Sequence, residues 1–302
     1  MLSVRSVSPR GLAVAPPTLH EAVRHFILGM PHLAHGGLSE CWLLKECGDI
    51  HWQLLARHHD LPLPDFRDRD GNRLYAAFVG LRLLDARLHK VSEHNPLQIA
   101  SSLSRTTRTR FVSSHAITSG RILVGRLEMA SVFVRRLAPR DNYSVARSIP
   151  DCPDVENRHG KASDRMAADF PSRAVRSNDA SWEIMGFRAS DRAPSLRTTL
   201  APCPYHDFNG ADFLYFASFQ ALADRAEWAW EGHRGLLTTR RREILYHGNV
   251  NVGDAVIAQR CALREHGAAL AHWTELITAR TGAKIADVFT LKCSIEEIQA
   301  NV

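Results

Sequence analysis

The sequence contains one pattern twice, and this repeat constrains the fold more than any other feature. In the first copy, the turn at Gly36-Gly37 opens directly onto a long apolar segment, and a strand-like run with Leu74-Tyr75 follows. In the second copy, Asn209-Gly210 opens onto the apolar segment 211–230, and Leu245-Tyr246 follows at nearly the same distance. Such self-similarity indicates a duplicated structural unit. We therefore expect two copies of one fold, each with a turn, a buried helix and a strand that carries a tyrosine.

Hydrophobic periodicity predicts the elements of each copy. Residues 37–57 and 210–230 have helical spacing, and residues 73–84 alternate as a strand. We expect this strand to place five side chains on one face: Tyr75, Ala77, Val79, Leu81 and Leu83. Short turns separate the other strand-like segments, which predicts antiparallel meanders. These segments are 96–104, 107–118 and 120–137 in the first copy, and 238–249, 254–264, 268–279 and 283–293 in the second.

The resulting layout is α+β, with a central helix wrapped by an antiparallel sheet in each copy. We expect a loose N-terminal arm over 1–19, without the apolar run of a signal peptide. The first domain is expected over 20–150 and the second over 200–302. The segment 151–199 between them is rich in Pro, Asp, Ser and Arg and has no periodicity, which indicates a connector, pinned near Trp182 and Phe187.

Composition excludes several classes of function. No apolar run approaches the roughly 20 residues that a membrane helix needs. The net charge is +6, but the basic residues are mostly arginine and are dispersed, which does not favour nucleic-acid binding. The six cysteines form no Cys-x-x-Cys pair, so we expect no disulfide framework, no metal site and reduced thiols in a cytoplasmic protein.

A family resemblance rests on the series Met30-Pro31-His32-Leu33, Gly36-Gly37-Leu38-Ser39-Glu40 and Gly48-Asp49-Ile50-His51-Trp52. Together with segments 71–82, 97–119 and 207–219, these motifs resemble the LnmK-type bifunctional acyltransferase/decarboxylases of polyketide biosynthesis. The resemblance implies a double hotdog fold. It also implies transfer of a methylmalonyl-type acyl group from acyl-CoA to the phosphopantetheine arm of an acyl carrier protein, with loss of CO2. The family's proposed catalytic tyrosine corresponds to Tyr75.

Decarboxylation of a malonyl-type thioester requires hydrogen-bond donors at the developing enolate oxygen and needs no tightly bound cofactor. The turn formed by Gly36, Gly37, Leu38 and Ser39 is one candidate, because backbone N–H groups at a helix start carry partial positive charge. Close approach of a thioester would also suit glycine. A tight turn with no role in binding explains the same glycines.

Four side chains are candidate catalytic groups: Tyr75, His32, His115 and Asn209. Tyr75 can donate a hydrogen bond to the thioester oxygen, or act as an acyl-accepting nucleophile if a base assists it. The histidines can donate to the carbonyl or carboxylate, and Asn209 can act at the second helix entrance or simply cap that helix. We expect the pocket between the two halves, closer to the first helix entrance, with Asn209 closing it.

Two other functions remain open at this point. A hotdog acyl-CoA or acyl-carrier-protein thioesterase would need a carboxylate on one of the helices, such as Glu40 or Asp212, to activate water. A non-catalytic protein that binds a carrier protein would not depend on Tyr75. The sequence leaves a homodimer open and does not identify the acyl group.

Overall fold

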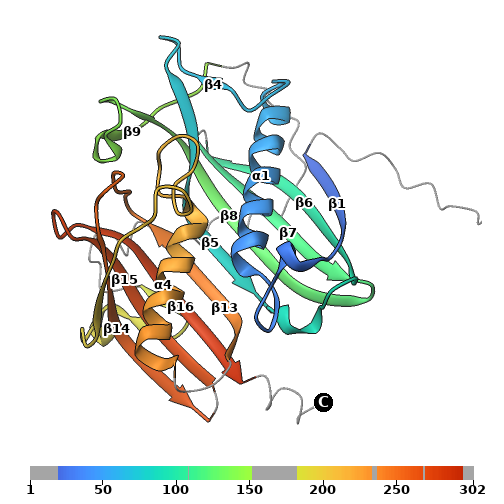
Figure 1. The fold of residues 1–302 in the computed structure, drawn as a ribbon. Coiled ribbons are helices and arrows are strands. Elements are labelled where there is room, and N and C mark those ends of the chain that lie inside the picture. Colours follow the sequence, from blue (N-terminus) through green and yellow to red (C-terminus); the bar gives the residue numbers. More distant parts are fainter. Residues whose placement is uncertain (1–19, 108, 152–181, 233–236, 268, 295–302) are drawn as a thin grey trace, which may run out of the picture.

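The computed structural model describes residues 20–107, 109–151, 182–232, 237–267 and 269–294. Its two long helices, α1 (Glu40–His58) and α4 (Phe216–Glu231), lie on the same face of one large antiparallel sheet (Figure 1). The order of the main strands is β1-β6-β7-β8-β5-β13-β16-β15-β14-β12. The first half of the chain supplies β1 to β8 and the second half β12 to β16, so the duplication is visible in the sheet.

The strand bounds agree closely with the expected segments. The first half contains β1 (Glu21–Ile27), β5 (Arg73–Leu84), β6 (Pro96–Thr107), β7 (Arg110–Ser119) and β8 (Ile122–Arg136). The second half contains β12 (Arg197–Leu200), β13 (Leu237–Tyr246), β14 (Val256–His266), β15 (Ala269–Thr278) and β16 (Lys284–Ser294). Shorter strands are β2 (Leu33–Ala34), β3 (Gly37–Leu38), β4 (Phe66–Arg67), β9 (Val145–Arg147), β10 (Glu183–Ile184) and β11 (Phe187–Arg188).

The two halves join through β5 and β13, which pair antiparallel from Leu83↔Arg242 to Gly80↔Leu245. The sheet is therefore continuous across the duplication, and each half packs one helix against its own strands. This arrangement is an α+β double hotdog, which confirms the fold expected from the repeat.

Helix α1 forms where the sequence places a cap before an apolar stripe. The Ser39 hydroxyl accepts a hydrogen bond from the Trp42 backbone N–H at 3.2 Å, as an N-cap serine does. Leu43, Cys47 and Leu54 recur at helical spacing and are fully buried against the sheet. The helix begins three residues later than expected, because residues 37 and 38 pair with β2 instead.

Helix α4 begins at Phe216, so the expected start at residue 210 was wrong. The Asn209 side-chain oxygen accepts hydrogen bonds from the backbone N–H groups of Ala211 and Phe213, at 3.0 and 3.1 Å. Asp212 has a φ of 59°, outside the helical region. Because this side chain captures the backbone donors locally, residues 209–215 form a turn that precedes the helix.

The expected single face of β5 is divided by a β-bulge between Phe78 and Gly80. Up to the bulge at Val79, Tyr75 and Val79 point to the outer face of the sheet, away from the helices. After it, Leu81 and Leu83 point into the core beneath α1. An extra residue in one strand reverses the alternation of side chains beyond it, and periodicity alone does not reveal such an insertion.

A second apolar cluster covers the outer face of the sheet. The described part of the connector contributes the β10–β11 hairpin, and Trp182 and Phe187 pack there against Trp273 and Phe289. Strand β12, which begins inside the segment expected to be connector, pairs with β14. The N-terminal arm expected over 1–19 lies outside the described residues. No helix in the described ranges has the length and apolar character to span a membrane.

Candidate functional site

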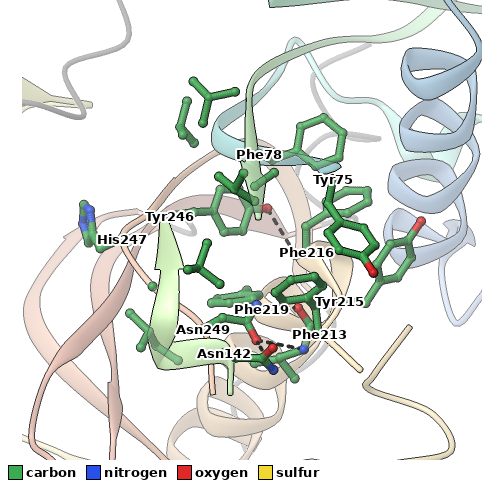
Figure 2. Close-up of a pocket in the computed structure, with 18 of the residues that line it drawn as sticks. Tyr75, Phe78, Asn142, Phe213, Tyr215, Phe216, Phe219, Tyr246, His247 and Asn249 are labelled. Atoms are coloured by element: carbon green, nitrogen blue, oxygen red, sulfur yellow. Dashed lines mark hydrogen bonds between the residues drawn. The ribbon is translucent and has the colours of Figure 1, made fainter. Parts of the chain in front are cut away.

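A pocket lies between the two halves, at the point where β5 and β13 stop pairing. Its volume is about 380 Å³. It is lined by residues 75–79 of β5, residues 213–216 that lead into α4, and residues 246–249 at the end of β13 and just after it (Figure 2). Trp52, in the second half of α1, also lines it. The pocket is therefore built by both halves, as expected, but at the entrance of α4 and not at that of α1.

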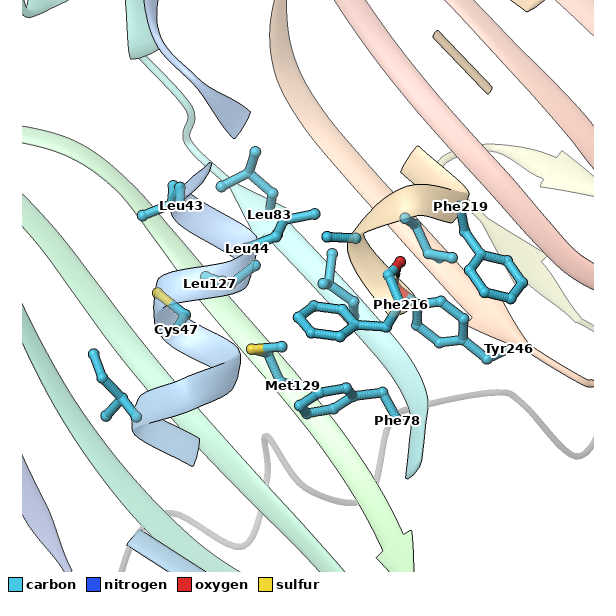
Figure 3. Close-up of a cluster of buried hydrophobic side chains, with 14 of the residues drawn as sticks. Leu43, Leu44, Cys47, Phe78, Leu83, Leu127, Met129, Phe216, Phe219 and Tyr246 are labelled. Carbon is cyan, nitrogen blue, oxygen red and sulfur yellow. Dashed lines mark hydrogen bonds between the residues drawn. The ribbon is translucent and has the colours of Figure 1, made fainter. Parts of the chain in front are cut away.

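The pocket has an inner and an outer compartment. Consecutive strand residues point to opposite faces, and all of residues 75–79 line the pocket, so it passes around the free edge of β5. The inner compartment, between the helices and the sheet, is aromatic and includes Phe78, Phe216, Phe219 and Tyr246 (Figure 3). The outer compartment is lined by small and branched side chains of β5 and β8, among them Ala77, Val132 and Val134.

Tyr75 lies where these compartments meet the loop before α4. Its ring packs edge-on against Phe213, with the ring centroids 5.1 Å apart. The guanidinium groups of Arg73 and Arg136 lie 5.7 and 5.8 Å from the Tyr75 ring centroid. The Tyr75 hydroxyl has no hydrogen-bond partner among the described residues. It is thus available to donate to a molecule in the pocket.

The other pocket tyrosines differ in how their hydroxyls are used. Tyr246 donates to the Phe216 carbonyl oxygen at 3.2 Å, and burial raises its pKa. The Tyr143 hydroxyl lies 2.8 Å from Asp254 Oδ2 and 2.9 Å from Thr278 Oγ1. Burial raises the pKa of Tyr215 to about 12, so this phenol stays protonated. Tyr215 and Tyr75 are the pocket phenols for which the described residues provide no hydrogen-bond partner.

Asparagine side chains fix the loop that carries Asn209 and Phe213. Asn249 Nδ2 donates to the Leu214 carbonyl at 3.0 Å, and Asn249 Oδ1 accepts from the Leu214 N–H at 2.9 Å. Asn142 Nδ2 donates to the Asp212 carbonyl at 2.7 Å and to the Val250 carbonyl at 2.6 Å. These bonds tie the first half to the second and hold the loop against the pocket, as Figure 2 shows for Asn142 and Asn249.

Asn209 lines this pocket together with Tyr75, as the sequence analysis expected of the pair. Its side-chain oxygen is occupied by the two backbone N–H groups of its own turn. Its Nδ2 group has no hydrogen-bond acceptor among the described residues. Asn209 is therefore not a helix cap, and its amide can donate to a bound molecule.

The charged groups of the pocket are mostly cationic, and none of its described lining residues is Asp or Glu. His247 Nε2 lies 2.6 Å from Asp287 Oδ2, directly behind the lining. Lys284 Nζ lies 3.0 Å from the same carboxylate oxygen. Burial alone would raise the pKa of Asp287, but the hydrogen bond from His247 and the charge of Lys284 lower it. Arg147 also lines the pocket, at the outer compartment.

The first helix entrance lies apart from the pocket, which contradicts the expected position. His32, Gly36, Gly37, Leu38 and Ser39 are all absent from the lining. Tyr75 stands near the C-terminal half of α1, where Trp52 is found, and so cannot share a site with the turn that begins this helix. His32 instead accepts a hydrogen bond from the Gly29 N–H at 2.9 Å and packs edge-on against Trp42.

A close backbone contact accounts for one of the glycines in this turn. Gly37 has a φ of 130°, and a Cβ placed on it would lie 2.1 Å from the Leu88 carbonyl oxygen. Only a residue without a side chain fits there. The structure thus supplies a packing reason for Gly37, while Ser39 serves as the N-cap of α1.

His115 is buried beneath α1, outside the pocket lining. Its Nδ1 lies 2.7 Å from Ser101 Oγ, and its Nε2 lies 2.8 Å from Ser113 Oγ. The same Ser113 hydroxyl lies 2.7 Å from His51 Nδ1. Burial lowers the pKa of both imidazoles to about 3, so they are neutral at pH 7. These contacts assign His115 to a hydrogen-bond network in the core.

The helix carboxylates that would activate water also lie away from the pocket lining. Glu40 is buried and forms an ion pair with Arg242, with Oε1 and Nε 2.6 Å apart. Arg242 is fully buried and also pairs with Asp224 at 2.7 Å. Lys292 and Glu227 extend this charged cluster between α4 and β16. No group of three or more His, Cys, Asp or Glu in the described part of the chain has the arrangement of a metal site.

Sequence reasoning missed most of the pocket. Phe213 and Tyr215 were assigned to a helix, and Asn249 to an ordinary turn. Asn142 and Arg147 lie after the last strand expected in the first domain, where no pattern marked them. One signal was present, because Gly248-Asn249 follows the second Leu-Tyr pair after a single residue, His247, and thus lies at the end of the strand that faces β5.

Comparisons with known proteins support the fold. No protein-family model matches the chain, and no curated protein matches it in sequence. The structure is similar to the 12:0-ACP thioesterase from Umbellularia californica, with a TM-score of 0.58, 8% identity and coverage of 90% of this chain and 93% of that one. It is also similar to an acyl-ACP thioesterase from Bacteroides thetaiotaomicron, with a TM-score of 0.54, 12% identity and coverage of 90% and 97%. At these identities the similarity establishes the shared fold.

Proposed function

We propose that this protein acts on an acyl thioester of CoA or of an acyl carrier protein, bound in the pocket between its two halves. The observation that carries the proposal is the position of Tyr75 and Asn209 on that pocket, each with a donor group for which the described residues provide no acceptor. The similarity to two thioesterases that act on acyl carrier proteins supports the same class of substrate.

We propose further that the phosphopantetheine thiol displaces CoA from a methylmalonyl-type thioester, with its proton passing to the CoA thiolate, and that the transferred group then loses CO2, as the resemblance to the LnmK-type family implies. In the decarboxylation step, the bond between Cα and the carboxylate breaks and its electrons form an enolate at the thioester carbonyl. Tyr75 and Asn209 are the donors to this enolate oxygen, and a proton from solvent completes the propionyl product. The aromatic inner compartment, led by Phe216 and Phe219, would hold the carboxylate with little hydration, which favours its loss.

The lack of a carboxylate on the described pocket lining favours this decarboxylation over hydrolysis by a carboxylate base. Enolate formation by decarboxylation needs hydrogen-bond donors and no base. Hydrolysis needs a group that activates water. Tyr75 is proposed to act as a donor, because no base that would make it a nucleophile lies within hydrogen-bond distance among the described residues.

The test is intact-mass analysis of a holo acyl carrier protein incubated with methylmalonyl-CoA and this protein. We expect the carrier to gain a propionyl group. Tyr75→Phe is expected to slow this reaction by roughly 10²–10³-fold, the usual loss for one oxyanion donor. Tyr205→Phe is the matched control, since Tyr205 is 91% exposed and lies outside the pocket. An unmodified carrier, or a wild-type rate in folded Tyr75→Phe, would contradict the proposal.

Hydrolysis of an acyl thioester is the second candidate. The two thioesterases of similar fold favour it, and His247 on the pocket lining, paired with Asp287 behind it, is the group that could activate water. The same experiment separates the reactions. A hydrolase would release free acid and CoA, leave the carrier protein unmodified and lose activity in His247→Gln.

A further inference from the structure

Strand register places two arginines beside the outer compartment of the pocket. Tyr75 pairs with Val134, which pairs on its other side with Arg147. Ala77 pairs with Val132, which pairs on its other side with Arg110. Directly paired residues share a face of the sheet, so each row runs from β5, across a valine of β8, to an arginine.

These two arginines lack acidic partners. Among the described residues, neither Arg110 nor Arg147 forms an ion pair or a side-chain hydrogen bond. Lys284, which lies on the described pocket lining with Arg147, is neutralised by Asp287 and Glu275. Burial and the neighbouring charge of Arg147 lower the pKa of Arg110 below its usual value. Two like charges thus lie close together, and no acidic side chain among the described residues balances them.

We infer that Arg110 and Arg147 form an anion site for the phosphate of the phosphopantetheine arm. The inference rests on the proposed function, because it takes the thioester to lie at Tyr75. The pantetheine chain leaves the thioester sulfur as a neutral, flexible segment that ends in a phosphate. Laid along the outer face from Tyr75, it crosses apolar Val132 and Val134 and ends at the arginine pair.

The geometry suits this path. Adjacent strands are about 4.8 Å apart, so the backbone of Arg147 lies roughly 10 Å from that of Tyr75, two strands away. A pantetheine arm spans this separation, and arginine guanidiniums bind phosphate oxygens through paired, charge-assisted hydrogen bonds. The outer compartment then holds the arm, and the acyl group turns around the edge of β5 into the inner compartment.

The experiment compares three unreactive thioethers by isothermal titration calorimetry: S-propyl-pantetheine, S-propyl-4′-phosphopantetheine and S-propyl-CoA. The first two differ only in the phosphate. We expect the wild-type protein to bind the phosphorylated compound about 10- to 100-fold more tightly, the usual effect of charge-assisted hydrogen bonds. The double variant Arg110→Gln/Arg147→Gln is expected to lose that difference and to bind S-propyl-pantetheine as before.

Arg121→Gln is the matched control. Arg121 is an exposed arginine at the opposite end of β7, in its turn to β8, and this variant is expected to keep the full difference. Replacement of the repelling pair is not expected to lower the melting temperature, which is measured in parallel. Higher salt should reduce the difference in the wild type.

The S-propyl-CoA arm identifies the source of the phosphate. Equal affinity for S-propyl-CoA and S-propyl-4′-phosphopantetheine supports a site shared by CoA and carrier-protein substrates. Stronger binding of S-propyl-CoA that is lost in the double variant supports a site that also engages the phosphates of CoA. The inference of an anion site is wrong if the wild type binds S-propyl-pantetheine and S-propyl-4′-phosphopantetheine equally, or if the double variant keeps their difference in affinity. The proposed function stands in either case. If none of the three binds, both are wrong.

Discussion

The close contact between Gly37 and the Leu88 carbonyl gives a sharp test of what the first helix turn does. In Gly37→Ala, the new Cβ would lie 2.1 Å from the Leu88 carbonyl oxygen and 2.8 Å from the His89 Cα. Both are backbone atoms, so a side-chain rotation cannot relieve the overlap. The loop 33–38 or the segment 88–90 must move instead.

Two costs add in this variant. A non-glycine residue at positive φ costs about 1–2 kcal/mol. Overpacking that shifts the backbone costs about 1–3 kcal/mol more. Gly71→Ala separates the two costs, because Gly71 has a φ of 79° and no atom within 4 Å of an added Cβ. We expect Gly37→Ala to lose about 2–5 kcal/mol of unfolding free energy. Gly71→Ala should lose only the cost of the positive φ, about 1–2 kcal/mol.

The assay is thermal unfolding combined with the carrier-protein reaction. At about 2–4 °C per kcal/mol, the melting temperature should fall by roughly 10 °C in Gly37→Ala and by about 4 °C in Gly71→Ala. The rate per folded molecule should equal that of the wild type in both, since neither glycine lines the pocket. A Gly37→Ala variant that is as stable as Gly71→Ala but has lost catalysis would refute this reasoning. The turn at Gly37 would then have a catalytic role.

Three further changes test other parts of the structure. Arg242→Met leaves the buried Glu40 carboxylate without its ion-pair partner, while Asp224 keeps Lys292, and should cost about 3–5 kcal/mol in chemical denaturation. Because the pKa of His115 is lowered to about 3, the unfolded chain binds a proton below pH 6.5 that the folded protein does not. Stability is therefore lost as pH falls from 6.5 towards 3, by up to about 1.4 kcal/mol per pH unit, and His115→Gln should show a smaller slope. In Gly48→Ala, the new Cβ would lie 2.6 Å from Phe216 Cζ and push that ring towards the pocket, so calorimetry should show weaker binding of long S-alkyl-CoA thioethers than of short ones.

The fold was predictable because its main signals are local and repeated. Alternation in β5 and helical spacing in α1 each involve neighbouring residues, and the second copy repeats them. The bulge after Phe78 was not predictable in the same way, because it depends on how β5 pairs with β8. The late start of α4 also escaped, since the side chain of Asn209 overrides the apolar periodicity that follows it.

The candidate site was only partly predictable, because it depends on which ends of distant strands meet. Tyr75 and Asn209 were placed together from the sequence, and the structure brings them to one pocket. His32 was joined to Tyr75 on the assumption that the first helix entrance lies near the first strand's tyrosine. In the sheet, Tyr75 lies towards the entrance of α4. This position depends on the pairing of β5 with β13.

The duplicated fold offers two equivalent places for a site, and the first residue of each helix distinguishes them. Helix α1 begins with Glu40, which lies against β13 and pairs with Arg242. Helix α4 begins with Phe216, which lies against β5, its ring centroid 4.5 Å from that of Phe78. At the first entrance, oppositely charged side chains satisfy one another and fill the space between helix and strand. At the second, aromatic rings line a pocket, and the loop held by Asn249 keeps it open to the outer face. One copy of the repeat has thus become a structural joint, and the proposed thioester site lies where the other copy retains an apolar entrance.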